Sequence, residues 1–243
     1  MAVIEFKNPV IKYGDFDVIE SFDLKIVNGE IITFFGPSGC GKSTLMKGVL
    51  NLICPEDPST ISINGKPASQ FEFPISYTPQ ANELLPWLSV RENIGLWSKD
   101  SNNDNLNIVN EVIELLDLKE AQDKLPQELS GGMARRTALA RCLATKSSIM
   151  CLDEVLVGIQ RSFRRDLMLN LRTFLKKNSI TTIIISHDYE EAVFMSDRII
   201  VLAPSPTLIS KPPIKVVEIL GENRNMSIFN KPEFELVAKQ LIS

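Results

Sequence analysis

Apolar residues fall in short runs along the chain, and segments of helical periodicity separate these runs. Residues 148–152, 181–186 and 198–202 are almost uninterrupted in apolar character, which is typical of central strands covered on both faces. An earlier β-rich run at 30–35 is followed by a glycine-rich turn and by a helix-like stretch at 42–52. This order of elements predicts an α/β core.

Residues 81–140 interrupt that core with a mainly helical pattern. Ile108, Val112, Leu115 and Leu116 recur at helical spacing, and residues 101–105 (Ser-Asn-Asn-Asp-Asn) are expected to form a polar loop. We therefore expect a single domain over residues 1–243, whose parts are a core with N-terminal strands at 1–80 and 141–205, a helical subdomain at 81–140, and a short C-terminal tail at 206–243.

Composition narrows the class of protein. Hydrophobic residues make up 44% of the 243 residues and charged residues 23%, which is ordinary for a globular protein. The net charge of −4 gives no reason to expect nucleic-acid binding, and the basic run of Arg161, Arg164, Arg165 and Arg172 is interpreted as a solvated helix face. No stretch approaches the ~20 apolar residues that cross a bilayer, so we expect any membrane role to go through a partner.

The four cysteines predict neither a zinc site nor a disulfide framework. Cys40, Cys54, Cys142 and Cys151 form no C-x-x-C pair, and the only histidine, His187, is far from them in sequence. We expect reduced and mostly buried thiols.

The glycine-rich turn fits the phosphate-loop pattern G-x-x-x-x-G-K-[ST], with a predicted strand before it and a predicted helix after it. Its glycines let backbone N–H groups point at phosphate oxygens, and the helix N-terminus favours anions. Lys42 is expected to reach the β- and γ-phosphates, and the Ser43 hydroxyl to bind Mg²⁺. The candidate nucleotide-binding residues are Gly36, Pro37, Ser38, Gly39, Cys40, Gly41, Lys42, Ser43 and Thr44.

Two carboxylates follow the buried strand predicted at 148–152. Asp153 is expected to hold Mg²⁺ through water, and Glu154 to orient or deprotonate the attacking water. An isolated Asp-Glu pair at a strand end is more often a solvated turn, but the phosphate loop earlier in the chain favours the catalytic interpretation.

Between these motifs, residues 129–133 read Leu-Ser-Gly-Gly-Met and open a helix-like stretch at 134–144. In this string, and in its position between the phosphate loop and the acidic pair, the chain resembles the ATPase subunits of ABC transporters. Ser130, Gly131 and Gly132 at a helix start suit a second anion site, although Ser130 could also be a simple N-cap. The resemblance implies an α/β fold of the ABC ATPase type, in which a helical subdomain is inserted into a P-loop NTPase core of a mixed sheet with flanking helices.

Other family positions match in sequence order. Gln80 resembles the residue that touches Mg²⁺ and relays the state of the site to the helical subdomain. His187 resembles the switch histidine that contacts the γ-phosphate. Tyr13 resembles the aromatic residue that stacks on adenine, although Phe16 is a nearby alternative. The resemblance covers residues 1–205.

The resemblance also implies a mechanism and partners. Two ATPase subunits, a homodimer or a mixed pair, face each other head to tail, and each MgATP lies between the phosphate loop of one and the Leu-Ser-Gly-Gly string of the other. Closure of the pair drives an integral membrane permease, and a periplasmic or extracellular solute-binding protein takes part indirectly. The expected location is peripheral, on the cytoplasmic face of the inner membrane.

Residues 84–93 (Leu-Leu-Pro-Trp-Leu-Ser-Val-Arg-Glu-Asn) resemble the importer branch for nitrate, sulfonates, taurine and related solutes such as thiamine precursors. Met133, in place of the usual glutamine, also occurs there. Residues 84–88 are either an ordinary core segment around Trp87 or part of an apolar groove for a permease helix.

The turn after the carboxylates departs from the family pattern. The proline, serine and aspartate expected there are absent, and Val155, Val157, Gly158, Ile159 and Gln160 occupy the matching positions. Hydrolysis is expected to be intact, with slow or altered coupling between the two sites. A non-transport ABC ATPase and a regulatory nucleotide sensor are the rival interpretations.

Overall fold

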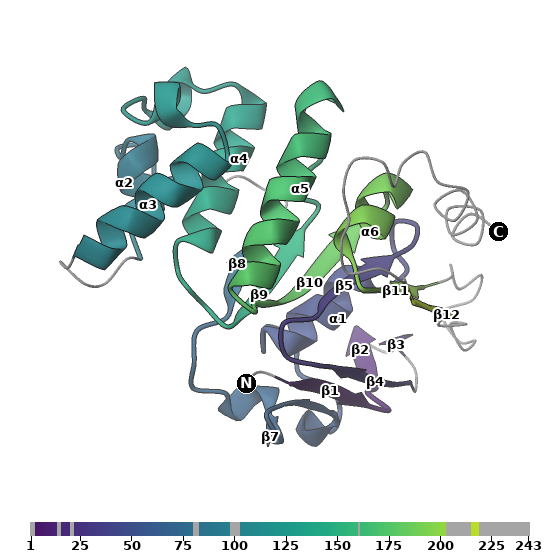
Figure 1. The fold of residues 1–243 in the computed structure, drawn as a ribbon. Coiled ribbons are helices and arrows are strands. Elements are labelled where there is room, and N and C mark those ends of the chain that lie inside the picture. Colours follow the sequence, from purple (N-terminus) through teal and green to yellow (C-terminus); the bar gives the residue numbers. More distant parts are fainter. Residues whose placement is uncertain are drawn as a thin grey trace.

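A six-stranded sheet forms the centre of the molecule (Figure 1). The structure is a computed structural model that describes residues 3–13, 16–19, 22–79, 83–97, 103–159, 161–202 and 215–218. In spatial order the strands are β12 (Lys215–Glu218), β11 (Arg198–Val201), β5 (Ile31–Phe35), β10 (Thr181–Ser186), β9 (Ile149–Asp153) and β8 (Ser76–Thr78). All neighbours are parallel except β11 and β12, so the sheet is mixed.

The central strands are apolar on both faces because each face has its own hydrophobic core. Along β10, Ile184 joins the core beneath the helices α2 to α6, whereas Ile183 and Ile185 join the core beneath α1 and the N-terminal strands. Successive strand residues point to opposite faces. This double burial explains the near-continuous apolar runs, which the structure confirms as strands.

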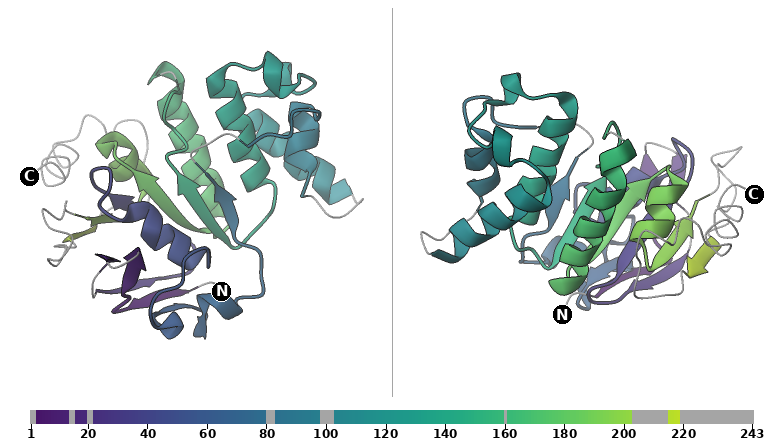
Figure 2. Two further views of the ribbon diagram at one scale, coloured as in Figure 1. Left: turned by 180° about the vertical axis from the view of Figure 1, so that it is seen from behind. Right: turned by 45° about the horizontal axis from the view of Figure 1, so that its top comes forward.

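A second, antiparallel sheet and α1 cover one face (Figure 2). Phe6 of β1 packs against Phe34 of β5 with ring centroids 6.3 Å apart, which joins the two sheets. The strands of this region are β4 (Asp23–Ile26), β1 (Ile4–Lys7), β6 (Ile61–Ile63) and β7 (Lys66–Pro67), with the hairpin β2 (Ile11–Tyr13) and β3 (Phe16–Ile19) beside them.

The helices α5 and α6 cover the opposite face, and α2, α3 and α4 gather beyond the β8 edge of the sheet (Figures 1 and 2). The helices are α1 (Lys42–Val49), α2 (Val90–Gly95), α3 (Asn103–Leu115), α4 (Gly131–Leu143), α5 (Arg161–Lys177) and α6 (Tyr189–Met195). Short 3₁₀ turns lie at Pro58–Thr60, Ala68–Gln70, Lys119–Ala121 and Pro126–Glu128. The inserted helical subdomain is therefore present, and α4 continues past residue 140 into the core. The expected domain boundaries stay predictions.

Two expectations about local structure are wrong. The polar segment at 101–105 is not simply a loop, because α3 begins at Asn103. The solvated-face interpretation is wrong for Arg172, which is only 5% exposed, and for Arg164, which is in ion pairs with α6 and the turn before it. The fold brings these two arginines against the carboxylates of Asp188, Glu191 and Asp197. Arg165 is partly exposed in its pair with Glu190, and the side chain of Arg161 lies outside the described part of the chain.

The four expected free thiols are present, and two of them are buried. Cys142 and Cys151 are buried, Cys40 is half-buried and Cys54 is exposed, and all four are free. Within the described ranges, no helix is both long enough and apolar enough to cross a membrane.

Asp197 ties α5 to the sheet. Its carboxylate accepts from Arg172 at 2.7 Å and Lys176 at 3.0 Å, both of α5, and from the amide of Ile31 at 2.9 Å. Burial raises the pKa of Asp197, but these hydrogen bonds and the charge of Arg172 outweigh it and the pKa lies below its ordinary value. The ionised carboxylate therefore stabilises the fold above pH ~4, and this contribution is lost as the pH falls through the folded-state pKa.

We expect Asp197→Asn to lower the free energy of unfolding by about 1–3 kcal/mol at pH 7, because it leaves the buried Arg172 guanidinium without its carboxylate. Urea denaturation followed by circular dichroism measures the change, which should shrink towards pH 3. Lys177→Gln is the control, since Lys177 is 73% exposed in its 3.8 Å pair with Glu111, and it should cost less than about 0.5 kcal/mol. Equal losses in both variants would contradict this role of Asp197.

Candidate functional site

Three neighbouring parallel strands end at one edge of the central sheet, and a cavity of about 590 Å³ lies there. Strand β5 leads into the phosphate loop, β9 ends at Asp153, and β10 ends just before His187. The register pairs Ile185 of β10 with Asp153 and Ser186 with Phe35. Residues from distant parts of the sequence therefore meet because carboxyl ends of parallel strands share one edge.

The phosphate loop fits tightly between β5 and the segment after β11. A Cβ atom on Gly36 would lie 2.3 Å from the Leu202 carbonyl oxygen and 2.9 Å from Cys40 Sγ, so only glycine fits there. Gly41, which precedes α1, has a φ of 96°, in the left-handed region that favours glycine. The loop thus turns directly into the N-terminus of α1, where backbone N–H groups are free to bind an anion.

Lys42 is a buried cation inside this loop. Its side chain donates to the carbonyls of Gly36 at 2.7 Å and Pro37 at 2.6 Å, and its residue is only 6% exposed. These partners are neutral, and the described part of the chain gives Lys42 no salt bridge. A buried charge without a salt bridge is costly, so an anion in the adjoining cavity is the natural complement.

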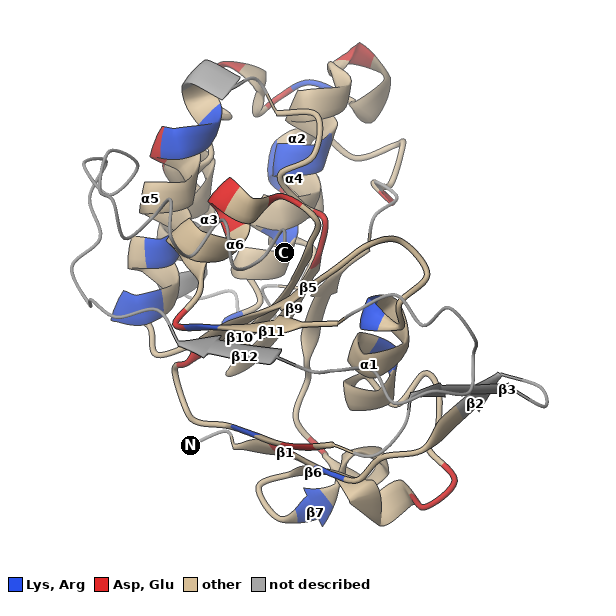
Figure 3. Ribbon diagram, turned by 90° about the vertical axis from the view of Figure 1, so that its right-hand side faces the viewer, with Lys and Arg blue, Asp and Glu red and all other residues tan. Residues whose placement is uncertain are grey.

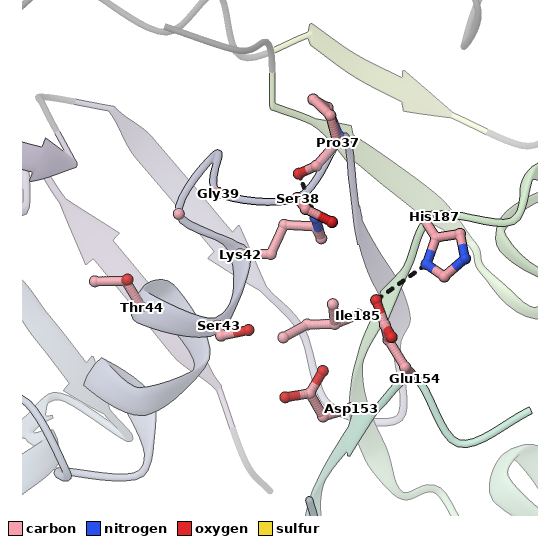
Figure 4. A pocket seen from close by; sticks show the side chains of 11 residues that line it. Pro37, Ser38, Gly39, Lys42, Ser43, Thr44, Asp153, Glu154, Ile185 and His187 are labelled. Carbon is pink, nitrogen blue, oxygen red and sulfur yellow. Dashed lines mark hydrogen bonds and ion pairs between the residues drawn. The ribbon is translucent and has the colours of Figure 1, made fainter. Parts of the chain in front are cut away.

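The two carboxylates and the histidine line the wall opposite Ser43 (Figure 4). Burial and the neighbouring charge of Glu154 raise the pKa of Asp153, and Lys42 and Lys47 partly oppose them. Glu154 Oε1 lies 3.0 Å from His187 Nδ1. Glu154 has a φ of 50°, a strained backbone conformation for a residue with a side chain, and its N–H donates to the Ile185 carbonyl at 3.1 Å.

Most of the candidate residues come together in this one cavity. Its predicted lining residues are Pro37, Ser38, Gly39, Gly41, Lys42, Ser43, Thr44, Asp153, Glu154 and His187. Gly36 and Cys40 belong to the same loop, where Cys40 Sγ lies 3.8 Å from Lys42 Nζ. Ile185 also lines the cavity and was missed, because an apolar strand residue has no chemical signature in the sequence.

Other candidate residues lie elsewhere. Ser130, Gly131 and Gly132 begin α4 and do not line the cavity. Ser130 Oγ accepts from the Met133 amide at 3.2 Å, so the N-cap interpretation of this hydroxyl is confirmed. Tyr13 ends β2, but its side chain is outside the described part, as is the whole of Gln80. Their roles, like those of all the site residues, stay predictions.

The apolar turn after Glu154 has two distinct parts. Val155 and Leu156 are buried, at 3% and 1% exposure, in the core beneath α4 and α5. Val157 offers its carbonyl to Arg135 of α4, and the Gly158 carbonyl approaches Gly132. The turn therefore connects β9 to α4, the helix whose N-cap is Ser130. Gln160 is outside the described residues.

The segment after the predicted Gln80 position exposes its aromatic residues. Trp87 is 70% exposed and Trp97 56%, and residues 84–88 contain no buried residue. The interpretation of this segment as ordinary core is therefore wrong for Trp87. Exposed tryptophans on one subdomain are typical of a docking surface.

A phosphate loop at a strand–helix junction, with an acidic pair at the end of β9, one strand beyond the neighbouring β10, defines a nucleotide-binding P-loop protein. The profile of the ABC transporter family matches residues 19–157, more than half of the chain. The chain therefore belongs to the ABC transporter family, and the expected family and fold are confirmed.

Similar proteins of named transporters show which kinds of ATP-binding subunit the chain resembles. The chain is 37% identical to the aliphatic sulfonates import ATP-binding protein SsuB 1 of Pseudomonas savastanoi pv. phaseolicola, over 80% of this chain and 78% of that protein. It is 34% identical to SsuB of Bacillus subtilis, over 93% of this chain and 86% of that protein. It is also 34% identical to the bicarbonate transport ATP-binding protein CmpC of Synechococcus elongatus, over 98% of this chain but only 36% of that longer protein.

A solved structure has the same fold. An ATP-binding cassette captured as a dimer in a post-hydrolysis state with ADP and Pi superposes with a TM-score of 0.74 at 23% identity, over 90% of this chain and 99% of that one. The sulfonate importers among the relatives confirm the resemblance to that importer branch.

The described residues fit a nucleotide with Mg²⁺ better than a metal held by protein alone. No cluster of three or more His, Cys, Asp or Glu suited to a metal occurs within the described residues. Mg²⁺ is usually bound by few protein oxygens together with substrate phosphates, and Ser43 and Asp153 line the same cavity as the buried Lys42.

We expect Gly36→Ala to weaken ATP binding about 10- to 100-fold, because relieving the clash with Leu202 costs about 1–3 kcal/mol and moves the carbonyl that binds Lys42. Titration with a fluorescent ATP analogue measures the affinity. Gly39→Ala is the control: its Cβ meets nothing within 4 Å, and only the φ of 84° opposes alanine, at about 1 kcal/mol. Unchanged affinity in Gly36→Ala would show that the loop does not need this fit.

Proposed function

We propose that the chain is the ATP-hydrolysing subunit of an ABC importer for a small solute of the nitrate, sulfonate, taurine or thiamine-precursor class. The main support is that Lys42, Ser43, Asp153, Glu154 and His187 surround one cavity, while the Leu-Ser-Gly-Gly string lies outside it. The site of one chain thus has the groups for one side of a triphosphate only. A second copy supplies the other side through the exposed N-terminus of α4.

In this proposal Lys42 and the N-terminal amides of α1 bind the β- and γ-phosphates of ATP. Ser43, Asp153 and Gln80 would hold Mg²⁺, which would supply positive charge for the phosphate oxygens. Glu154 orients the attacking water and accepts its proton as the water oxygen bonds to the γ-phosphorus and the bond to ADP breaks. His187, 3.0 Å from Glu154, contacts the γ-phosphate, and Tyr13 stacks on adenine.

Two features indicate the partners: the site of one chain has groups for only one side of a triphosphate, and Trp87 and Trp97 are exposed. A second ATPase subunit, an identical copy or a related chain, completes each site. An integral membrane permease docks on the surface around Trp87 and Trp97, and selects the solute together with a solute-binding protein. The chain is then peripheral to the cytoplasmic face of the membrane. No nucleic acid takes part.

The uncharged turn at 155–160 favours an ATPase with slow coupling between its two nucleotide sites over a non-transport ATPase or a regulatory sensor. Both carboxylates and His187 are present, as hydrolysis requires, whereas the turn contains no charge. The contact of Arg135 with the Val157 carbonyl holds the turn through its backbone, which does not depend on the missing aspartate.

We expect Glu154→Gln to lower MgATP hydrolysis by about 10²–10⁴-fold while ATP binding is retained, because the amide cannot accept the proton of the water. The variant should accumulate as an ATP-bound dimer, which a MgATPase assay and size-exclusion chromatography with ATP detect. Glu114→Gln on the exposed face of α3 is the control and should behave like the parent. Hydrolysis by Glu154→Gln at the parental rate would remove Glu154 from the chemistry.

We expect the double change Val157→Ser with Gln160→Asp to raise the turnover severalfold if the uncharged turn limits communication between the sites. Steady-state MgATPase activity as a function of ATP concentration measures both the rate and the cooperativity. Val157→Ala, which adds no polar group, is the control. No change in the double variant would show that coupling through this turn is not limiting.

A further inference from the structure

Glu191, in the first turn of α6, is a buried carboxylate that the mechanism above does not use. Its residue is 1% exposed. Its Oε2 accepts from Ser186 Oγ at 2.7 Å and from Arg164 Nη2 of α5 at 3.3 Å. Figure 3 shows the acidic start of α6 against the basic residues of α5.

These contacts hold both neighbours of His187. Ser186 precedes the histidine, and its Oγ donates to Glu191 and accepts from the amide of Asp188 at 3.0 Å. Asp188 follows the histidine, and its carboxylate accepts from the Glu191 amide at 3.0 Å and from Arg164 Nη1 at 2.8 Å. The turn of residues 186–188 is therefore fixed from behind by Glu191 and Arg164, while His187 faces Glu154 in front.

The cluster is incompletely satisfied. Among the described residues, Oε1 of Glu191 and Nε of Arg164 are buried without a hydrogen-bond partner. Burial of a carboxylate with one unpaired oxygen disfavours its charged form. Burial raises the pKa of Glu191 to about 7, against the opposing effects of Ser186 and Arg164.

We propose that Glu191 is a positioning residue whose ionised form holds the 186–188 turn and thereby orients His187 towards the reacting phosphate. Protonation removes the charge that Arg164 and Ser186 bind, so Arg164 is left with Asp188 alone and the turn is held less firmly. The proposal rests on the proposed ATPase function, because it concerns a residue of that site.

The other charges around Glu191 are few. Arg164 from α5 and His187 from the turn favour its ionised form, and Asp188 opposes it. Strand β10 contributes Ser186 to the cluster, and β5 (Ile-Ile-Thr-Phe-Phe) contains no charged residue. The pH dependence therefore belongs to this cluster, with the holding contacts strengthening as the pH rises through neutrality.

As the pH rises through neutrality, the cluster's contribution to stability falls, whereas the proposed activity rises. The folded chain binds this proton more tightly than the unfolded chain, so the cluster's contribution to stability falls between pH ~4.5 and pH ~7. Such a trade of stability for activity is common at functional sites.

The first test uses the fact that His187 is the only histidine of the chain. In protein without a histidine tag, NMR follows the imidazole resonances of His187 from pH 5 to pH 9. We expect these resonances to report a transition of Glu191 in the parent that is absent from Glu191→Gln. Glu190→Gln is the matched control, since Glu190 pairs at 3.3 Å with the neighbouring Arg165, and it should keep this transition.

Imidazole resonances of the parent that do not shift between pH 5 and pH 9 overturn the proposal, and this result needs no variant to fold. A transition that persists unchanged in Glu191→Gln also overturns it. Because no nucleotide is added, this titration tests the cluster even if the proposed ATPase function fails; absence of MgATPase activity in the parent refutes that function separately.

The second test is kinetic. We expect Glu191→Gln to lower kcat about tenfold at pH 8, with ATP affinity within about twofold of the parent, and to lose the rise of kcat through neutral pH. Arg164→Lys, which keeps the charge but not the two-pronged contact, should lower kcat less and retain the pH profile. An unchanged kcat and pH profile in a folded Glu191→Gln overturns the proposal, as does the same loss in Glu190→Gln.

Discussion

The site depends on a lysine ammonium held inside a glycine loop. The Gly36 and Pro37 carbonyls fix Lys42 Nζ, and the close approach of the Leu202 carbonyl fixes Gly36. The positive charge is thus positioned by the loop itself, which is the preorganisation that phosphoryl transfer requires of a protein with little covalent chemistry to perform. Asp153, Glu154 and His187 gain their significance from lying around this charge.

The sheet explains why those three residues can be so far apart in sequence. Strands β5, β10 and β9 are neighbours, so Gly36, His187 and Asp153 emerge at the same edge. The helix that begins with Ser130 is outside this cavity and is joined to it through Arg135 and the turn after Glu154. The helical subdomain is therefore joined to the segment that follows the carboxylates through a backbone contact of an uncharged turn.

The sequence alone was sufficient for the phosphate loop, the acidic pair and the central strands, because each has a local pattern with a physical cause. It was insufficient where contacts between residues distant in sequence determine the structure. Arg164 and Arg172 look like a solvated face until α6 and Asp197 pack against them. Asn103 looks like a loop residue, yet it starts α3, since tertiary packing overrides weak helix propensity. Glu191 has no signature at all, because its importance comes from burial beside the His187 turn.

The central claim is that two copies build each nucleotide site from unlike surfaces, and complementation tests it most directly. Lys42→Ala removes the positive charge from the phosphate loop, and Ser130→Arg blocks the N-terminus of α4. Each variant alone should therefore be inactive. In an equal mixture, mixed dimers contain one site made from the two intact surfaces, so MgATPase activity should return at about a quarter of the parental level. A mixture no more active than the sum of its components would contradict the account.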